Sequence, residues 1–265
     1  MIIKRIVRKA KKLLASFKEH IKDRRRKTRE NRFVKNGCVM HGINGKTSVF
    51  LPNFKVDYIQ NTIFNTKNYF EKENLDFVCK SWRDGVIATA IKERSVLDIG
   101  CNIGNHTLYY ANECGAKSIY CFEPIAKTYD VLSKNVGLNK LETKTHLYQV
   151  GVGASSTKAR IGHYDEKNIG GTTIEVANDG DIPIVSIDEL NIQDIGLVKI
   201  DVEGFELNVL KGMTKTLERE HPFITIEIRD ANFEEAYKIL SNYGYQYVEI
   251  EEHRDYRDYN DYLFF

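Results

Sequence analysis

Short apolar runs alternate with longer amphipathic segments over the C-terminal two-thirds of the chain. The runs have the length and the β-branched and aromatic content of buried strands, and segments with helical periodicity separate most of them. They lie at residues 95–99, 118–122, 145–150, 197–201, 223–228, 245–250 and 261–265. This alternation predicts an α/β fold with a mostly parallel, seven-stranded sheet and helices on both faces, in which the last run inserts as a strand.

The remaining segments predict helices and short connections around this core. Helices are expected over about 105–114, near 125–138 and over 57–82. Residues 37–54 predict short strands with turns, and 151–187 predict an insertion of turns and short strands between the third and fourth core strands.

The N-terminal segment has a different pattern, because its apolar residues recur at three- and four-residue steps, as on one face of a helix. These residues are Ile3, Ile6, Val7, Ala10, Leu13, Leu14, Phe17 and Ile21. Residues 1–35 hold 15 Lys and Arg against 3 Asp and Glu, whereas the rest of the chain holds 24 basic and 34 acidic residues. We therefore expect a basic amphipathic helical arm (1–35), a lead-in region (36–92) and an α/β domain (93–265).

Two interpretations of the basic arm stay open. It could lie in a membrane interface with its cations among anionic headgroups, or it could pack on its own domain or on a partner protein. The run Arg24–Lys27 could also attract nucleic acid, but no aromatic platform or RNA-binding module accompanies it. Nucleic acid is therefore the less favoured partner.

Composition limits the cellular location and the kinds of site. No apolar run approaches the ~20 residues that span a bilayer, and the N-terminus lacks the apolar stretch and cleavage site of a signal peptide. The five cysteines are an odd number without a C-x-x-C pair, and the histidines show no metal-ligand spacing. We therefore expect a cytoplasmic protein without a disulfide framework and without a bound metal.

The turn after the first core strand carries the clearest sign of a ligand. The apolar run reaches Asp98, turns through Gly100 and Gly104, and enters the expected helix at Asn105. Glycines let the backbone approach a ligand, and the free N–H groups of the helix face the same space. The spacing D-x-G-x-x-x-G departs from a dinucleotide fingerprint, because Asn102 stands where a middle glycine would be expected.

The acid in this turn distinguishes between ligands. A carboxylate at Asp98 would repel a pyrophosphate but suits a cationic amino group, and S-adenosylmethionine (SAM) has such a group and no phosphate. The pattern therefore favours a SAM site over an NAD site, while a tight turn without a ligand remains an alternative. The candidate cofactor-binding residues in the turn are Asp98, Gly100, Asn102, Gly104 and Asn105.

A second acid supports a nucleoside-binding site. Glu123 lies 23 residues after Gly100, at the end of the second expected strand. A carboxylate at this position can accept hydrogen bonds from both ribose hydroxyls, although an acid beside Pro124 would also interact well with the dipole of the next helix. Val152 and its flanking glycines, after the third strand, are candidates for contact with the adenine edge.

With these motifs the sequence resembles the FkbM-type SAM-dependent methyltransferases over roughly residues 55–228. The resemblance is strongest in four segments, and the K-x-D-x-E-G-x-E run in the last is the most specific. The segments are Val96–Asn105, Phe122–Pro124, Ser186–Leu190 and Val198–Glu206. The resemblance implies a Rossmann-like class I methyltransferase fold for 93–265, SAM as cofactor, and usually O-methylation of a sugar or natural product. Cys101 replaces the alanine of many members, and the basic arm lies outside the resemblance.

Acids at the ends of the fourth and fifth expected strands are the candidate catalytic residues. Asp201 and Glu203 follow the fourth strand at the edge where such sheets bind ligands, and Glu227 lies on the fifth. Methyl transfer to a hydroxyl requires alignment and removal of the hydroxyl proton, which a carboxylate can accept. Capping of the next helix is the alternative role for Asp201 and Glu203. Glu203 or Glu206 could orient the acceptor, and His106 could act as a base.

The sequence thus predicts a SAM-dependent O-methyltransferase of polysaccharide biosynthesis that methylates a sugar hydroxyl of a cell-surface or lipid-linked glycan. The cytoplasmic face of the membrane is its expected location, with the arm contacting the membrane or a glycan-synthesis partner. The loop at Asn168, Gly170 and Gly171 could close over the substrate. The alternatives are an RNA methyltransferase that grips its substrate through the arm and a scaffold that retains the fold without activity. The fourth strand leads into Asp201–Gly204 rather than an N/D-P-P-Y/F segment, which disfavours methylation of a nucleic-acid base.

Overall fold

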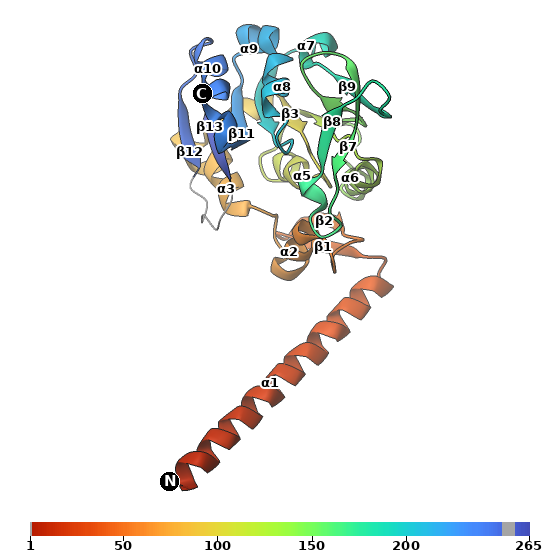
Figure 1. Cartoon of the computed structure of the whole chain (residues 1–265), viewed down its shortest axis with the longest axis vertical. Helices are drawn as coiled ribbons and strands as arrows, with labels where there is room; N and C mark the ends of the chain where they lie inside the picture. The colour runs from red at the N-terminus through yellow and green to blue at the C-terminus, as the bar shows by residue number, and fades with distance from the viewer. Residues whose placement is uncertain (1, 251–257) are drawn as a thin grey trace. The chain divides into compact units, whose positions relative to one another are not determined.

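The computed structural model describes residues 2–250 and 258–265, and it describes their side chains except those of 2–10 and 13. The chain forms two compact units, 1–40 and 41–265. The first contains one long helix, α1 (Ile2–Lys35), so the predicted N-terminal helix is confirmed (Figure 1). Most of the residues assigned to its apolar face, from Ile3 to Leu13, have side chains outside the described residues.

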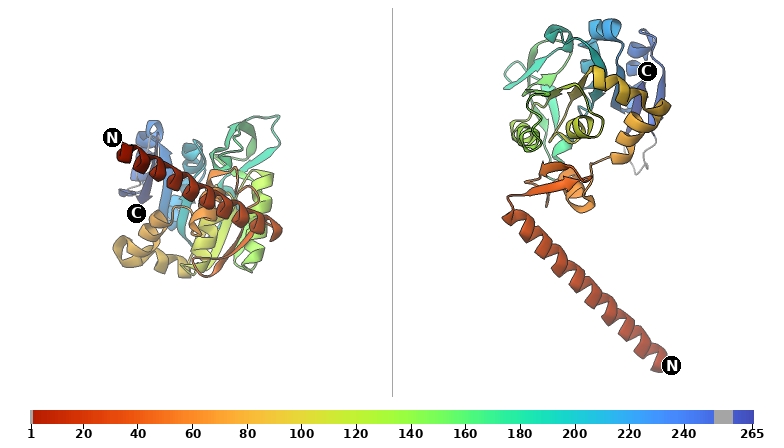
Figure 2. Two further views of the ribbon diagram at one scale, coloured as in Figure 1. Left: turned by 90° about the horizontal axis from the view of Figure 1, so that it is seen from below. Right: turned by 180° about the vertical axis from the view of Figure 1, so that it is seen from behind.

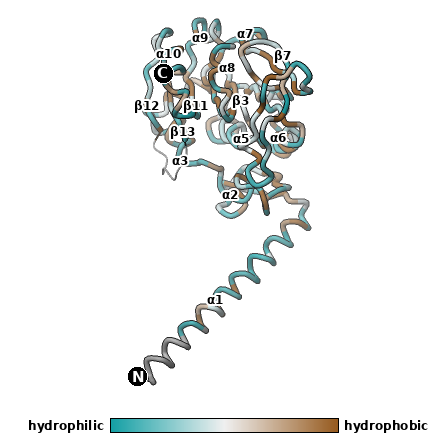
Figure 3. The backbone as a smooth tube through the Cα atoms, in the orientation of Figure 1, coloured by the Kyte–Doolittle hydropathy of each residue, from teal (hydrophilic) through white to brown (hydrophobic). Residues whose placement is uncertain are grey.

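Further along α1, two large apolar side chains of that face are exposed. Leu14 is 58% exposed and Phe17 is 63% exposed, while Figure 3 shows that hydrophilic residues predominate along the described part of the helix. The helix ends where Gly37 adopts a left-handed backbone, with a φ of 69°. Among the described residues, no helix has the length and apolarity that crossing a membrane requires.

The central sheet of the second unit has seven strands in the order β12-β13-β11-β10-β3-β4-β5. Its strands are β3 (Ser95–Ile99), β4 (Ser118–Phe122), β5 (Thr145–Tyr148), β10 (Ile195–Ile200), β11 (Phe223–Arg229), β12 (Tyr247–Ile250) and β13 (Tyr259–Phe264). The neighbouring strands β11-β10-β3-β4-β5 are parallel to one another, and β13 runs antiparallel between β11 and β12. The α/β fold, the strand count and the inserted last strand are therefore confirmed.

Helices cover both faces of this sheet (Figures 1 and 2). They are α4 (Val86–Glu93), α5 (Asn105–Asn112), α6 (Ala126–Leu138), α7 (Ile187–Leu190), α8 (Glu206–Lys211), α9 (Thr214–Glu220) and α10 (Phe233–Ser241). A short 3-10 helix, η4 (Asp230–Asn232), precedes α10. The connections between the parallel strands therefore place helices along the sheet, as crossover connections require.

The main hydrophobic core shows how strand alternation divides the two faces. Leu97, Ile99, Val198 and Ile200 pack with residues of α8, α9 and α10 in one buried cluster. Because successive side chains of a strand point to opposite faces, the residues between them face the other side. Asp98 indeed bonds to a residue of α5 rather than to this cluster. One face of the sheet is thus apolar, and the other carries buried charge in addition to buried apolar side chains.

The lead-in region precedes the sheet and supplies part of the cleft described below. It contains β1 (Val39–Ile43), β2 (Thr47–Phe50), α2 (Tyr58–Thr66), α3 (Lys72–Asp76), the π-helix η1 (Phe77–Ser81) and the 3-10 helix η2 (Trp82–Gly85). Most of residues 57–82 are helical as expected, but the stretch between α2 and α3 is not, and Lys67 and Glu71 at its two ends have left-handed φ angles.

The expected insertion forms a second, four-stranded sheet. Its strands are β6 (Gly151–Val152), β7 (Thr157–His163), β8 (Thr173–Val176) and β9 (Ile182–Val185), in the order β6-β9-β7-β8, with the 3-10 turn η3 (Ile169–Gly171) between β7 and β8. The third core strand ends at Tyr148 rather than near 150, and the fourth at Ile200, so that Asp201 lies just beyond its strand.

Candidate active site

The turn between β3 and α5 requires glycine at position 100. Gly100 has a φ of 74°, and a Cβ atom built on it would lie 1.7 Å from the backbone oxygen of Asp201. The backbone nitrogens of Gly100 and Cys101 donate to the Phe122 oxygen over 3.0 and 3.1 Å. The missing side chain thus lets the turn lie directly against the end of β10.

Glu123 connects this turn to the end of β4. Its buried carboxylate accepts the backbone N–H of Asn102 over 3.0 Å and that of Ile125 over 2.9 Å. Burial raises the pKa of Glu123 to about 7, although these two hydrogen bonds favour the charged form. Each carboxylate oxygen has a second lone pair, so Glu123 can still accept hydrogen bonds from a ligand.

A cleft opens beside Glu123. Four predicted cofactor-binding residues line it, namely Gly100, Asn102, Glu123 and Val152, and so do the three predicted catalytic acids, Asp201, Glu203 and Glu227. The ends of β3, β4, β10 and β11 therefore bring together residues that lie far apart in the sequence, as expected for the carboxyl edge of a parallel sheet.

Three other predicted cofactor-binding residues do not line the cleft. Asp98 is fully buried on β3, and Gly104 packs under Leu132, with only 2.7 Å between a built Cβ and the leucine Cδ1. Asn105 exchanges two hydrogen bonds with the backbone of Phe70, of 2.9 and 3.0 Å. These three residues therefore support the cleft wall, and any role in contact with a cofactor remains a prediction.

Asp98 belongs to a buried charge network with Lys199 of β10. The Thr107 hydroxyl donates to Asp98 over 2.5 Å, and the Lys199 Nζ atom lies 3.7 Å from the other carboxylate oxygen. Burial raises the pKa of Asp98, while Lys199 and Thr107 oppose the rise. The registered pairing of Lys199 with Asp98 on adjacent strands makes this contact possible.

Lys199 also reaches the cofactor turn and a catalytic candidate. Its ammonium donates to the Gly100 oxygen over 2.8 Å and lies 3.0 Å from an oxygen of Asp201. Burial favours the neutral amine, but Asp201 and Asp98 outweigh it and raise the pKa of Lys199 above its usual value. Lys199 stands in the K-x-D-x-E-G-x-E run, yet that pattern alone assigned it no role.

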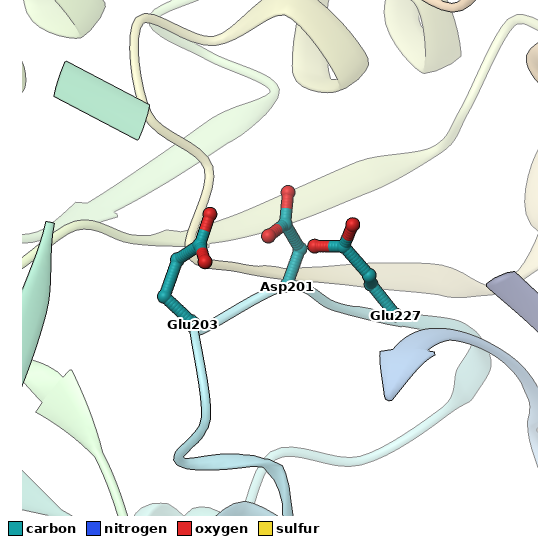
Figure 4. Close-up of side chains that lie close together, drawn as sticks. All are labelled: Asp201, Glu203 and Glu227. Atoms are coloured by element: carbon teal, nitrogen blue, oxygen red, sulfur yellow. The ribbon is translucent and has the colours of Figure 1, made fainter. Parts of the chain in front are cut away.

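Three carboxylates of the cleft lining lie close together (Figure 4). One carboxylate oxygen from each of Asp201, Glu203 and Glu227 lies within 4.8 Å of the others. Burial and repulsion by Asp201 and Glu206 raise the pKa of Glu203 to about 7. Burial and repulsion from acids that include Asp201 and Asp261 raise the pKa of Glu227 to about 10. At neutral pH Glu227 therefore holds a proton.

The same spacing bears on metal binding. Carboxylate oxygens this close could hold one hard cation, because such ions prefer oxygen ligands. The spacing of histidines and cysteines does not reveal that these three carboxylates converge. Their convergence depends on the neighbouring positions of β10 and β11.

Helix capping, the alternative role for Asp201 and Glu203, is not what the structure shows. Helix α8 begins at Glu206, and its N-cap residue Phe205 makes no side-chain capping bond. Glu203 precedes the helix in a left-handed conformation with a φ of 51°. Glu206 itself accepts the Gly204 N–H over 2.5 Å. The acids before the helix are thus available to the cleft.

His106 lies in a smaller pocket beside the main cleft, which Glu71, Asp201 and Glu227 also line. Its Nε2 atom is 3.8 Å from a carboxylate oxygen of Glu71. Burial, with a further contribution from Lys199, lowers the pKa of His106 to about 3. The imidazole is therefore neutral at physiological pH and a weak base.

The lead-in region supplies cleft residues that the sequence did not indicate. Three such residues line the cleft, namely Tyr58, Phe70 and Glu71. They precede the cofactor turn in the sequence but lie close to it in the fold. The rings of Tyr58 and Phe70 meet edge to face, with centroids 5.7 Å apart. No local pattern distinguishes these residues from the ordinary apolar and charged positions of a helical segment.

The predicted loop in the insertion also reaches the cleft. Asn168 and Gly170 line it, whereas Gly171 does not. The Ile169 N–H donates to Asp57 over 3.0 Å, and the Tyr58 N–H donates to the Lys167 oxygen over 2.9 Å. The loop is therefore held against the start of α2.

Comparisons with known proteins place this domain in a family. The family model described as the methyltransferase FkbM domain matches residues 98–247, more than half of the chain. The chain is 33% identical over 138 residues to the hexuronic acid methyltransferase AglP of Haloferax volcanii, covering 49% of this chain and 54% of that protein. It is 28% identical over 154 residues to the methyltransferase sdnD of Sordaria araneosa, covering 44% and 60% respectively.

A solved structure supports the fold. The crystal structure of the methyltransferase FkbM from Methylobacillus flagellatus KT superimposes with a TM-score of 0.51 at 17% identity, covering 66% of this chain and 44% of that one. The matches thus span little more than half the length of these two curated relatives, and less than half of the crystallised protein. Methyl transfer is the chemistry of the matched domain, and SAM is its cofactor. The chain therefore belongs to the FkbM methyltransferase domain family.

Proposed function

We propose that the whole protein is a SAM-dependent O-methyltransferase that methylates a sugar hydroxyl of a cell-surface or lipid-linked glycan. The observation that supports this most directly is that one cleft is lined both by Glu123 and by Asp201, Glu203 and Glu227. The 33% identity to a protein named a hexuronic acid methyltransferase supports a sugar as the acceptor.

The cleft fits a nucleoside cofactor. Glu123 would accept hydrogen bonds from the ribose hydroxyls, the backbone at Gly100 and Asn102 would approach the cofactor closely, and Val152 would contact the adenine. When bound, SAM supplies an electrophilic methyl group on a sulfonium sulfur. Asp98 would act on this site indirectly, because it pairs with Lys199, whose ammonium donates to the Gly100 oxygen.

The acid cluster provides groups for the acceptor hydroxyl. Lys199 holds one oxygen of Asp201, whose side chain is 35% exposed and reaches the cleft. Glu203, with a pKa of about 7, can take up a proton near neutral pH, which suits a general base. Glu227 holds a proton in the ligand-free protein, and its carboxyl group can form a hydrogen bond with an acceptor hydroxyl. These residues would align the hydroxyl and receive its proton.

The basic helix supports a location at a membrane surface. Helix α1 exposes Leu14 and Phe17 beside many lysines and arginines, the combination that binds the interface of an anionic bilayer. All five cysteines are free thiols, which is typical of the cytoplasm. We therefore place the protein at the inner face of the cytoplasmic membrane, where it would meet a lipid-linked glycan or the proteins that build it.

Two measurements test this proposal. The first is calorimetric titration of the full chain with SAM and with its demethylated product, where absence of heat from both would favour a non-catalytic scaffold. The second is transfer of radiolabelled methyl groups to glycan and RNA fractions. We expect label in the glycan, whereas label in RNA that disappears on deletion of residues 1–35 would favour the RNA methyltransferase.

A further inference from the structure

The smaller pocket beside the main cleft has a lining that cofactor binding does not account for. Of the described residues that line it, none is a predicted cofactor-binding residue. We infer that this pocket holds the sugar ring that bears the acceptor hydroxyl, and that His106 and Asn74 bind hydroxyl groups of that ring. The inference rests on the proposed function, because it concerns the acceptor of the same reaction.

The candidate catalytic acids connect the two cavities. Asp201 and Glu227 line both, whereas Glu123, the candidate ribose ligand, lines only the main cleft. Methyl transfer requires the acceptor oxygen to approach the methyl group from the side opposite the sulfur, so the acceptor and the cofactor must occupy adjoining spaces. A sugar in the smaller pocket would contact acids that also line the cofactor cleft. The arrangement therefore provides separate space for the two ligands beside the same two carboxyl groups.

The other residues of the smaller pocket suit a sugar. The neutral imidazole of His106 has one donor and one acceptor nitrogen, and the Asn74 amide likewise donates and accepts. Each group can therefore bond to a hydroxyl, which has both capacities itself. Leu75, Val78 and Ile250 line the same pocket and supply apolar surface for the C–H groups of a sugar ring. A mostly apolar wall with a few polar groups is typical of small-molecule sites.

His106 lies where a ligand can meet its ring. It stands in the first turn of α5, directly beyond the cofactor turn, and its side chain is 16% exposed. The Nε2 atom is 3.8 Å from a carboxylate oxygen of Glu71, which is too far for a hydrogen bond. Glu71 lines both cavities. A sugar hydroxyl near these two groups could therefore form a hydrogen bond with each.

Part of the pocket wall lies outside the matched family domain. The family model covers residues 98–247, whereas Asn74 of α3, Ile250 of β12 and Asp261 of β13 fall outside it. The Asn74 amide donates to Asp261 over 3.5 Å, so α3 and β13 meet at this pocket. A cofactor common to the family is expected to be bound mainly by the matched residues. The wall that selects the acceptor can differ between members, which supports an acceptor in this pocket.

Sugar probes offered to the cofactor-loaded protein test the inference. The probes are 4-nitrophenyl β-glucoside and 4-nitrophenyl β-glucuronide, one neutral and one acidic. Saturation-transfer NMR would measure their binding to the full chain saturated with demethylated SAM, and calorimetry would measure SAM binding. The wild type would be compared with His106→Leu, which removes both ring nitrogens, and with His106→Gln, which restores a donor and an acceptor.

We expect at least one probe to bind the wild type and His106→Leu to weaken that binding about fivefold or more, because a sugar hydroxyl loses its partner. SAM affinity should change far less, and His106→Gln should recover most of the sugar affinity.

Three results would overturn the inference. They are an equal loss of SAM affinity in His106→Leu, which would assign the pocket to the cofactor, unchanged sugar binding in that variant, and failure of both probes to bind the loaded wild type. A wild-type chain that gives no heat with SAM would overturn the proposed function as well, and the calorimetry identifies that case.

Matched variants at exposed positions assign the effect to the pocket. His163→Leu and Asn178→Leu make the same changes at exposed residues that line neither cavity. We expect Asn74→Leu to weaken sugar binding as His106→Leu does, and both control variants to bind the probes like the wild type. Equal effects of Asn74→Leu and Asn178→Leu would contradict a local origin.

Discussion

Replacing Lys199 with methionine would break the charge network behind the cofactor turn. The Lys199 side chain is 7% exposed and its ammonium contacts Asp98, Asp201 and the Gly100 oxygen. Methionine fills similar space but removes the charge and the donor. Asp98, which is fully buried, would then keep only its hydrogen bond from Thr107.

The variant should lose stability because the Asp98 carboxylate stays buried without its cationic partner. Removing one partner of a buried ion pair costs about 3–5 kcal/mol, because the remaining charge stays buried and unpaired. Protonation of Asp98 can relieve part of this cost. The double variant Lys199→Met, Asp98→Asn should therefore be destabilised by clearly less than the sum of the two single variants.

The pH dependence has a defined sign. The pKa of Asp98 is raised by burial even with Lys199 in place, and it will rise further without the lysine. The additional cost of burying the carboxylate is present above the unfolded-state pKa of about 4 and disappears below it. The difference in unfolding free energy between wild type and Lys199→Met should therefore shrink as the pH falls toward 4.

Urea denaturation followed by circular dichroism measures these differences. Lys117→Met is a matched control, because Lys117 makes a shorter ion pair of 2.7 Å with Asp194 but is 53% exposed. We expect that control to lose only a small fraction of the stability lost by Lys199→Met. Equal losses for the two lysine variants, or additive losses in the double variant, would refute the buried network.

Three further predictions concern the turn and the acids. Gly100→Ala should lower both stability and SAM affinity strongly, because its Cβ would strike the Asp201 oxygen. Gly115→Ala is the control, because Gly115 has a similar φ of 72° and only a flexible lysine within 4 Å. Urea denaturation and calorimetry compare the two variants, and similar losses would contradict the tight packing at Gly100. Asp201→Ala should lower the methyl-transfer rate by about 10²-fold or more while SAM affinity changes far less; a variant with normal turnover would remove Asp201 from the mechanism. SAM binding should release a proton from Glu227, whose raised pKa of about 10 falls beside a sulfonium, so affinity rises between pH 7 and 10; calorimetry in buffers of different ionisation enthalpy detects this release, which Glu227→Gln should abolish.

The sequence predicted the strands well where an apolar run ends in a turn residue. Strands β3 and β4 lie at the expected positions, 95–99 and 118–122, because each run is short and ends at Gly100 or Glu123–Pro124. The bounds of the fourth core strand, β10, were predicted less exactly. Its start at Ile195 precedes the β-branched run, and register with β3 rather than composition determines its length.

The orientation of side chains was harder to predict than their proximity. Asp98 was expected to face a ligand because it is next to the glycine turn, but its place on β3 directs it toward Thr107 and Lys199. That outcome depends on β10 being the neighbour of β3. The residues around Asp98 do not reveal which strand pairs with β3. Glu71 and Phe70 reach the cleft for a similar reason, since bonds between Asn105 and Phe70 hold the lead-in region there.

Titration of the full chain with SAM, compared with the same titration of Glu123→Ala, tests the central claim most directly. Glu123 lines the cleft and can accept hydrogen bonds from the ribose, and each charged hydrogen bond contributes about 1.5–3 kcal/mol. The wild-type protein should bind one SAM, and the variant, shown to be folded by its denaturation curve, should bind at least about 10-fold more weakly. A folded wild-type chain that gives no heat with SAM, or a variant with unchanged affinity, would contradict the account.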